Sequence, residues 1–270
     1  LEEQMFLLER QHVTRDWKQL SQRERRSANK DISTETINKH QALFDDFWST
    51  TLDLGRIPAT SEFEYSDQLR RVAGSHLKAF QALNEQYGAS LFKEAQEARQ
   101  NDLLVYFALG LFDKREAYNQ MPDSLKRDIK VFFKSISDAQ DQARTILFSV
   151  GKPEVIQDAC VSAHSQIKCG EYTDGHSFTF HKDYLNSMPA VLRIYIGCAI
   201  QLYGDIDEIH LIKAHIRSGK VSLMRYKGWE KDIPLLIERI KIKLREQDID
   251  FFDYIGAYDP TPLLNKAIYK

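Results

Sequence analysis

The sequence lacks the glycine-rich segments on which nucleotide-dependent and nucleophilic enzymes depend. Its 12 glycines are scattered, and none forms a P-loop, a GxSxG nucleophile turn or a GxGxxG dinucleotide motif. We therefore expect no catalytic residues and no cradle for a nucleotide or for S-adenosylmethionine in this chain. Recognition or targeting is the function that these absences favour.

Cysteines are few, and long apolar runs and an excess of one charge are missing. The three cysteines form no CxxC pair, which favours reduced thiols in a cytoplasmic protein. No apolar run approaches the roughly 20 residues that cross a bilayer, so we expect no membrane partner. The net charge is −2, so a surface for nucleic acid has to be a local basic patch.

The hydrophobic period changes between the two halves of the chain. Apolar residues recur at helical spacing over residues 37–54, and Gly55 is expected to end that helix. Further helices are expected as far as residue 163 and over residues 189–203. Period-two patterns predict a strand at 177–181, a hairpin over 209–227 and further strands at 240–244 and 249–254.

These patterns predict an α+β fold with a helical N-terminal half and a small C-terminal antiparallel sheet that carries helices. The helical half is expected to contain a helix-turn-helix-like unit of three helices. The expected domains are a helix and linker over residues 1–30, a helical domain over 31–100 and an α+β domain over 101–270. The tail after residue 259 is expected to be extended.

The first candidate site is the three-helix unit, which has helix-turn-helix spacing. Its third helix, which opens at Ser75, is expected to bury Leu77 and to present polar side chains to base edges. Arginines of the preceding turn and helix are expected to contact phosphates. The residues expected at DNA are Arg56, Arg70, Arg71, His76, Lys78 and Gln81. The alternative is a helical bundle with solvated charges.

The second candidate site is the outer surface of the sheet. If Ile212 and Ile242 face the core, the basic residues that alternate with them face outward. Two such strands would form a positive platform for phosphates. Its expected members are Lys213, His215, Arg217, Lys220, Lys241, Lys243 and Arg245. The alternative is an outer surface rich in lysine only because water covers it.

Two further groups were weighed as metal sites, and neither has a familiar spacing. A zinc site would use Cys160, His164, Cys169, His176 and His181. A magnesium-dependent nuclease site would use Asp205, Asp207, Glu208 and Lys213. We expect no metal site, and a metal-dependent nuclease remains an alternative function.

Two stretches of sequence resemble known families. The pattern LGR-x-P at residues 54–58, followed by GS-x-x-KA at 74–79, is similar to small helix-turn-helix repeats of homing-endonuclease type. A longer resemblance runs in order through residues 102–106, 128–133, 147–151, 192–199, 211–215, 220–222 and 260–266. It resembles the C-terminal part of the methyltransferase-like proteins associated with bacterial DNA phosphorothioation. Ile196 and Asn265 depart from that pattern, because relatives often carry an acidic residue and a histidine there.

The longer resemblance implies that a methyltransferase-like domain precedes this chain, which begins at Leu1. S-adenosylmethionine would belong to that domain and not to this fragment. The implied function is a DNA-binding and targeting module of a bacterial phage-defence or restriction-modification system. The implied partners are duplex DNA, including phosphorothioate-modified DNA, and other phosphorothioation or defence proteins. A protein-interaction or dimerisation module without DNA contact is the main alternative.

Overall fold

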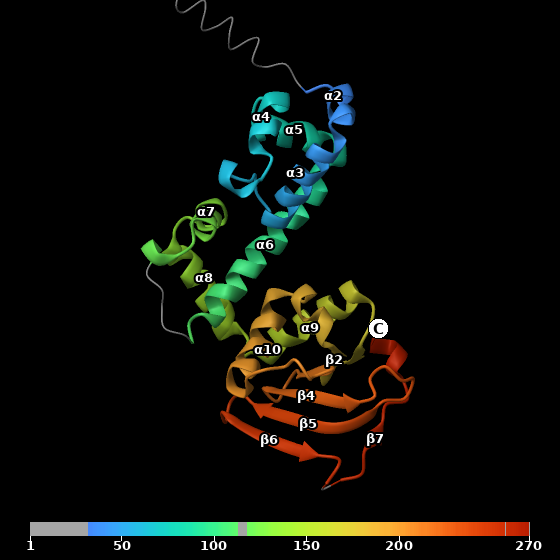
Figure 1. Ribbon diagram of the computed structural model, residues 1–270. Coiled ribbons are helices and arrows are strands. Elements are labelled where there is room, and N and C mark those ends of the chain that lie inside the picture. The colour runs from blue at the N-terminus through green and yellow to red at the C-terminus, as the bar shows by residue number, and fades with distance from the viewer. Residues whose placement is uncertain (1–31, 113–117, 257, 270) are drawn as a thin grey trace, which may run out of the picture. The chain divides into compact units, whose positions relative to one another are not determined.

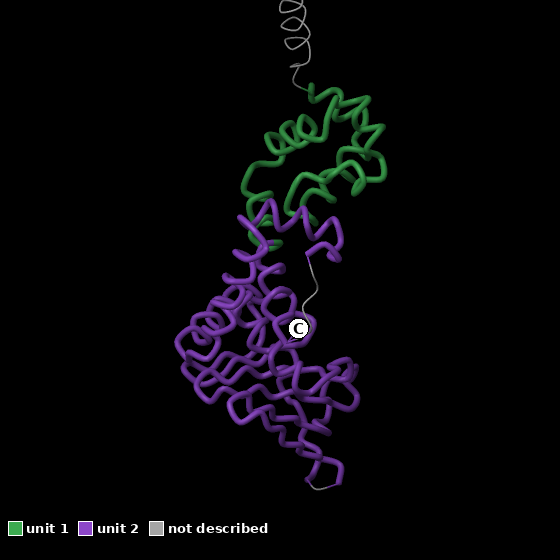
Figure 2. Tube along the Cα trace, turned by 90° about the vertical axis from the view of Figure 1, so that its left-hand side faces the viewer, with its two compact units in different colours: residues 1–99 green, residues 100–270 purple. Residues whose placement is uncertain are grey.

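The computed structural model describes residues 32–112, 118–256 and 258–269. The helix and linker expected over residues 1–30 lie outside the described residues. The chain forms two compact units, Leu1–Arg99 (unit 1) and Gln100–Lys270 (unit 2), shown in Figure 2. The boundary falls inside the continuous helix α6 (Ala89–Leu109), where the sequence suggested a new helix beginning near residue 101.

Helices make up most of the first half of the chain and an antiparallel sheet its end, which confirms the predicted α+β class (Figure 1). Unit 1 contains α2 (Thr34–Lys39), α3 (Gln41–Leu54), η1 (Thr60–Glu62), α4 (Ser66–Ala73) and α5 (His76–Tyr87). Gly55 ends α3 in the left-handed conformation, at a φ of 59°, as the sequence indicated. Ser75 caps α5 by accepting a hydrogen bond from the amide of Lys78.

Unit 2 adds the helices α7 (Asp123–Phe132), α8 (Ile136–Ser149), α9 (Pro153–Ile167) and α10 (Ala190–Tyr203). Ser135 caps α8, and Pro153 occupies the first turn of α9, where no amide hydrogen is needed. Among the described residues, no helix combines the length and the apolar character that a bilayer crossing requires.

The sheet is antiparallel throughout, and its main strands lie in sequence order. They are β1 (Glu171–Thr173), β2 (Ser177–His181), β3 (Leu211–His215), β4 (Lys220–Lys227), β5 (Leu235–Lys243) and β6 (Asp248–Asp253). The short strand β7 (Thr261–Pro262) pairs with β5. The segment η3 (Lys182–Ser187) and helix α10 come between β2 and β3.

Helices α9 and α10 cover one face of the sheet (Figure 1). Phe178, Ile212 and Leu223 point from neighbouring strands into this core and are fully buried. They pack against apolar residues of α10 such as Leu192 and Ile196. Because side chains alternate along a strand, the residues between them point to the second face.

The C-terminal tail packs on one end of this second face. Leu211, Met224 and Tyr226 form a small apolar cluster there with Tyr269 of η4 (Lys266–Tyr269). The hydroxyl of Tyr269 donates to a carboxylate oxygen of Glu171 at 3.0 Å. The tail is therefore packed on the sheet over its last residues, whereas the sequence predicted an extended segment.

Candidate nucleic-acid interface

The second face of the sheet carries a row of basic and small residues beyond the end that the tail covers. The register pairs Lys213 of β3 with Ser222 of β4, and Ser222 with Lys241 of β5. Neighbouring strands lie about 4.8 Å apart, so the Cα atoms of the two lysines are about 10 Å apart. Both lysines are partly exposed, and neither forms an ion pair within the described parts of the chain.

The adjacent row adds more basic residues. His215 pairs in register with Lys220, and Lys220 with Lys243. We call the surface formed by Lys213, His215, Lys220, Ser222 and Lys241 the basic face. It brings together four of the seven residues that the sequence assigned to a platform.

Lys243 lies beside the basic face, but its charge is already paired. Its Nζ lies 3.0 Å from a carboxylate oxygen of Asp248 and 2.8 Å from one of Asp250. These hydrogen bonds raise the pKa of Lys243 to about 12. The expectation that Lys243 is available to a phosphate was therefore wrong, because β6 supplies two carboxylates.

Small hydroxyl residues separate the basic side chains, and sequence reasoning missed them. Ser177, Thr179 and Ser222 are only 1%, 3% and 2% exposed and lie on the same face as Lys213. Hydroxyl groups this buried pair with polar neighbours, as Ser222 does with Nε2 of His215 at 3.0 Å, and leave the phosphate contacts to the more exposed lysines. The sequence did contain the pattern that places Ser222 on this face, because Ser222 stands two residues after Lys220 and so points to the same side of the strand.

His215 reports the electrostatic character of the basic face. Burial, and to a smaller extent electrostatic repulsion from Lys213, His176, Lys241 and Lys220, together lower its pKa to about 4. Its Nε2 lies 3.0 Å from the hydroxyl oxygen of Ser222. His215 is therefore neutral at pH 7 and sits in a field that favours anions.

The pKa of His215 is expected to rise above about 5 when a phosphate group binds nearby, because the anion stabilises the imidazolium. Affinity for the anion should then increase as the pH falls below the pKa of the bound state, and His215 should contribute no pH dependence near pH 7. An NMR titration of the His215 imidazole with and without a short DNA duplex measures both values. An unchanged pKa would place the DNA elsewhere.

Arg245 is not part of the basic face, although the sequence pattern placed it there. Regular alternation ends with β5 at Lys243, and the amide of Leu244 then donates to the carbonyl of Gly219. The side chain of Arg245 consequently lies against Gly219 and lines a cleft that also contains Tyr195. Arg217 lies in the β3–β4 turn, is exposed and packs over Gly175.

In unit 1, Arg56 was expected to be free to contact phosphates, and this was wrong. It is only 4% exposed, and its two terminal nitrogens donate to the two carboxylate oxygens of Glu62 at 2.7 and 2.8 Å. Glu62 also accepts from the amide of Ala59. Arg56 therefore stabilises the turn between α3 and α4, and its guanidinium is not available to DNA.

The third helix of the unit is rotated from the orientation that was predicted. His76 packs inward, with its Nδ1 2.8 Å from the carbonyl oxygen of Pro58 and its ring 5.2 Å from that of Phe47. Leu77, expected in the core, is 53% exposed. The prediction that His76 faces a DNA groove was therefore wrong, because a hydrogen bond and aromatic contacts hold it inside.

The remaining candidates of unit 1 lie at its surface. Arg70, Arg71 and Gln81 are exposed, and Lys78 is partly exposed beside Gly74. Acidic residues outnumber basic ones over residues 32–99. The described residues 32–99 thus offer scattered basic side chains and no dense basic patch like that of unit 2.

The residues weighed as metal ligands are not brought together. Within the parts that the structure describes, no three His, Cys, Asp or Glu side chains form a group that could hold a metal ion. Cys160 is fully buried in the core, and His164 stacks on Tyr172. Glu208 is paired with Arg225, so it does not join Lys213 in a nuclease-like cluster.

Comparison with known proteins gave no match among protein-family models, curated proteins or solved structures. The resemblance to phosphorothioation-associated proteins rests on the sequence segments quoted above and stays a prediction. Function is therefore inferred from the residues and geometry of the two units.

Proposed function

We propose that the chain is a DNA-binding and targeting module that contacts the phosphate backbone through its basic face. The observation that carries this proposal is the row Lys213–Ser222–Lys241, in which two lysines that form no ion pair with any described residue flank a hydroxyl group. The low pKa of His215 supports it, because the same lysines contribute to that shift. Contacts of this kind position a duplex without reading its sequence.

Sequence reading would then come from other residues. Arg70, Arg71 and Gln81 are the exposed polar candidates on α4 and α5. The role of the basic face is electrostatic, and it accounts for affinity and its dependence on salt.

The resemblance leads us to propose that the module belongs to a phosphorothioation-associated, methyltransferase-like defence protein. S-adenosylmethionine would be bound by a separate domain of that protein. Phe252 lies on the same side of the sheet, with Arg239 4.7 Å and Lys241 5.3 Å from its ring centre. An apolar ring beside two cations suits a phosphorothioate, whose sulfur is larger and less strongly hydrated than oxygen.

A salt titration of DNA binding tests the proposal. With three or four lysine and arginine contacts, the logarithm of the association constant should fall with the logarithm of salt concentration at a slope of about −3 to −4. Unmodified and phosphorothioate duplexes of the same sequence should be measured in parallel. If neither duplex bound at low salt, the DNA-binding proposal would be wrong, and the alternative of a protein-interaction module would replace it.

A further inference from the structure

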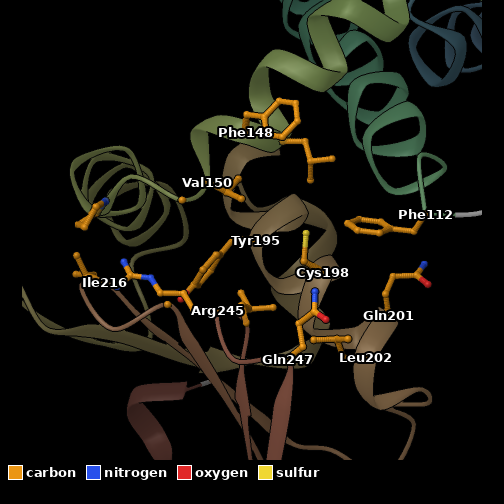
Figure 3. A pocket seen from close by; sticks show the side chains of 15 residues that line it. Phe112, Phe148, Val150, Tyr195, Cys198, Gln201, Leu202, Ile216, Arg245 and Gln247 are labelled. Carbon is orange, nitrogen blue, oxygen red and sulfur yellow. The ribbon is translucent and has the colours of Figure 1, made fainter.

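An apolar cleft lies on the helix-covered side of the sheet, away from the basic face. Its volume is about 540 Å³, within the range of small-molecule sites. The end of α8, helix α10 and the tips of the β3–β4 and β5–β6 hairpins line it (Figure 3). Phe112, Phe148 and Leu202 border it and are 55%, 74% and 42% exposed. Apolar side chains that gather at the border of one cleft form an exposed patch, and such patches often mark binding sites.

One wall of the cleft is rigid. Tyr195 is almost fully buried, and its hydroxyl lies 2.9 Å from the carbonyl oxygens of His215 and Lys220. These contacts fix the ring to both strands of the β3–β4 hairpin, next to its turn. Burial raises the pKa of the Cys198 thiol to about 11, so this wall residue stays protonated and unreactive at pH 7.

Among the described residues that line this apolar cleft, Arg245 is the one cationic side chain. The side chain of Arg245 extends beside Tyr195, as Figure 3 shows. Arg245 forms no ion pair with any residue in the described ranges. Gln201 and Gln247 are the other strongly polar lining residues. A guanidinium without a counter-ion next to an apolar wall is complementary to an anion that carries an apolar body.

We infer that this cleft binds an amphipathic small molecule, with its apolar or aromatic body against Phe148 and Leu202 and its anionic group on Arg245. Binding is non-covalent and independent of the proposed DNA contact, because the basic face is on the opposite side of the sheet. The volume accommodates a body of two or three fused or linked rings or a medium-length alkyl chain.

Two fluorescent probes of nearly equal shape test this inference on the whole chain. The anionic probe is 1-anilinonaphthalene-8-sulfonate, and the neutral probe is N-phenyl-1-naphthylamine. Arg245→Gln should lower the affinity for the anionic probe about tenfold or more. It should change the affinity for the neutral probe by less than about twofold. Leu202→Trp, at the exposed border of α10, should weaken both probes because it narrows the cleft. Decanoate should displace the anionic probe if carboxylates are accepted.

Arg217→Gln is the matched control, since it removes an exposed arginine from the neighbouring turn and should change neither probe by more than about twofold. Duplex DNA should not displace the anionic probe, and Lys213→Glu with Lys241→Glu should leave its affinity unchanged. An Arg245→Gln variant that binds the anionic probe like the wild type overturns the inference. So does displacement of that probe by DNA, and neither result bears on the affinity for DNA.

Discussion

Replacing Lys213 and Lys241 together with glutamate is expected to lower the affinity for duplex DNA by about 100-fold or more at about 50 mM salt. The two lysines flank Ser222 in one row of the sheet, so a phosphate backbone that crosses β4 meets both. Glutamates at these positions remove two attractions and add two repulsions. The fold should survive, because both side chains are partly exposed and belong to no ion pair of the described residues.

Replacing the same two lysines with neutral glutamine separates the loss of phosphate contacts from the repulsion that glutamate adds. Lys213→Gln with Lys241→Gln should make the salt slope shallower by about 2, one unit for each lost phosphate contact. The matched control is Lys130→Glu with Lys152→Glu, which changes charge equally at exposed positions on α7 and before α9. If the control lowers the affinity for DNA as much as Lys213→Glu with Lys241→Glu does, then the net charge of the chain, and not the basic face, determines that affinity.

Arg56→Ala is expected to lower the free energy of unfolding of unit 1 by about 3 to 5 kcal/mol, because it leaves the carboxylate of Glu62 without its buried partner. Arg56→Lys should recover little of this loss, since an ammonium cannot replace the two parallel hydrogen bonds. Hydrogen exchange of the amides of α3, α4 and α5 in the whole chain measures the effect locally.

Arg70→Ala is the comparison variant for Arg56. Arg70 is exposed on the neighbouring helix α4, so its loss should change stability by no more than about 0.5 kcal/mol. If Arg56→Ala kept full amide protection and reduced the salt slope of DNA binding, Arg56 would be a phosphate contact after all. We expect the opposite pattern. Arg56→Ala should greatly reduce the protection of the unit 1 amides from hydrogen exchange, and the folded variant should bind DNA with an unchanged salt slope.

The parts of the fold that depend on local periodicity could be predicted from the sequence. Alternation of Ile212 and Ala214 with Lys213 and His215 indicated which side chains leave the core, and the structure agrees. The order of the strands could not be predicted, because strand pairing is set by long-range contacts. Only the register shows that one strand, with a serine at the facing position, separates Lys213 from Lys241.

The incorrect site predictions have two physical causes, which are a polar partner that the fold brings to the side chain and a change of local geometry. His76 looked polar and therefore exposed, but the carbonyl of Pro58 accepts its hydrogen bond inside the unit. Lys243 is neutralised by carboxylates of the next strand. Arg245 leaves the face of Lys241 because regular pairing stops two residues before it. Composition and spacing contain no information on such partners.

The two faces of the sheet thus differ in chemistry. The face under α9 and α10 is apolar and ends in the cleft beside Tyr195, whereas the second face is divided between the C-terminal tail and the basic face. Because the tail already packs on Leu211 and Met224, a duplex is confined to the rows of Lys213 and His215 and to the β5–β6 end of the next row, where Arg239 and Phe252 lie. The size of the interface is therefore limited, which fits a positioning contact more than a complete recognition surface.

Lysine footprinting tests the central claim most directly. The free chain and its complex with duplex DNA are briefly acetylated at low salt, and the modification of each lysine is compared by mass spectrometry. DNA should protect Lys213, Lys220 and Lys241 of the basic face, while Lys130 and Lys152 react equally in both samples. Equal acetylation of the three face lysines with and without bound DNA, or protection confined to Lys78 of α5, would contradict the assignment of DNA binding to the basic face.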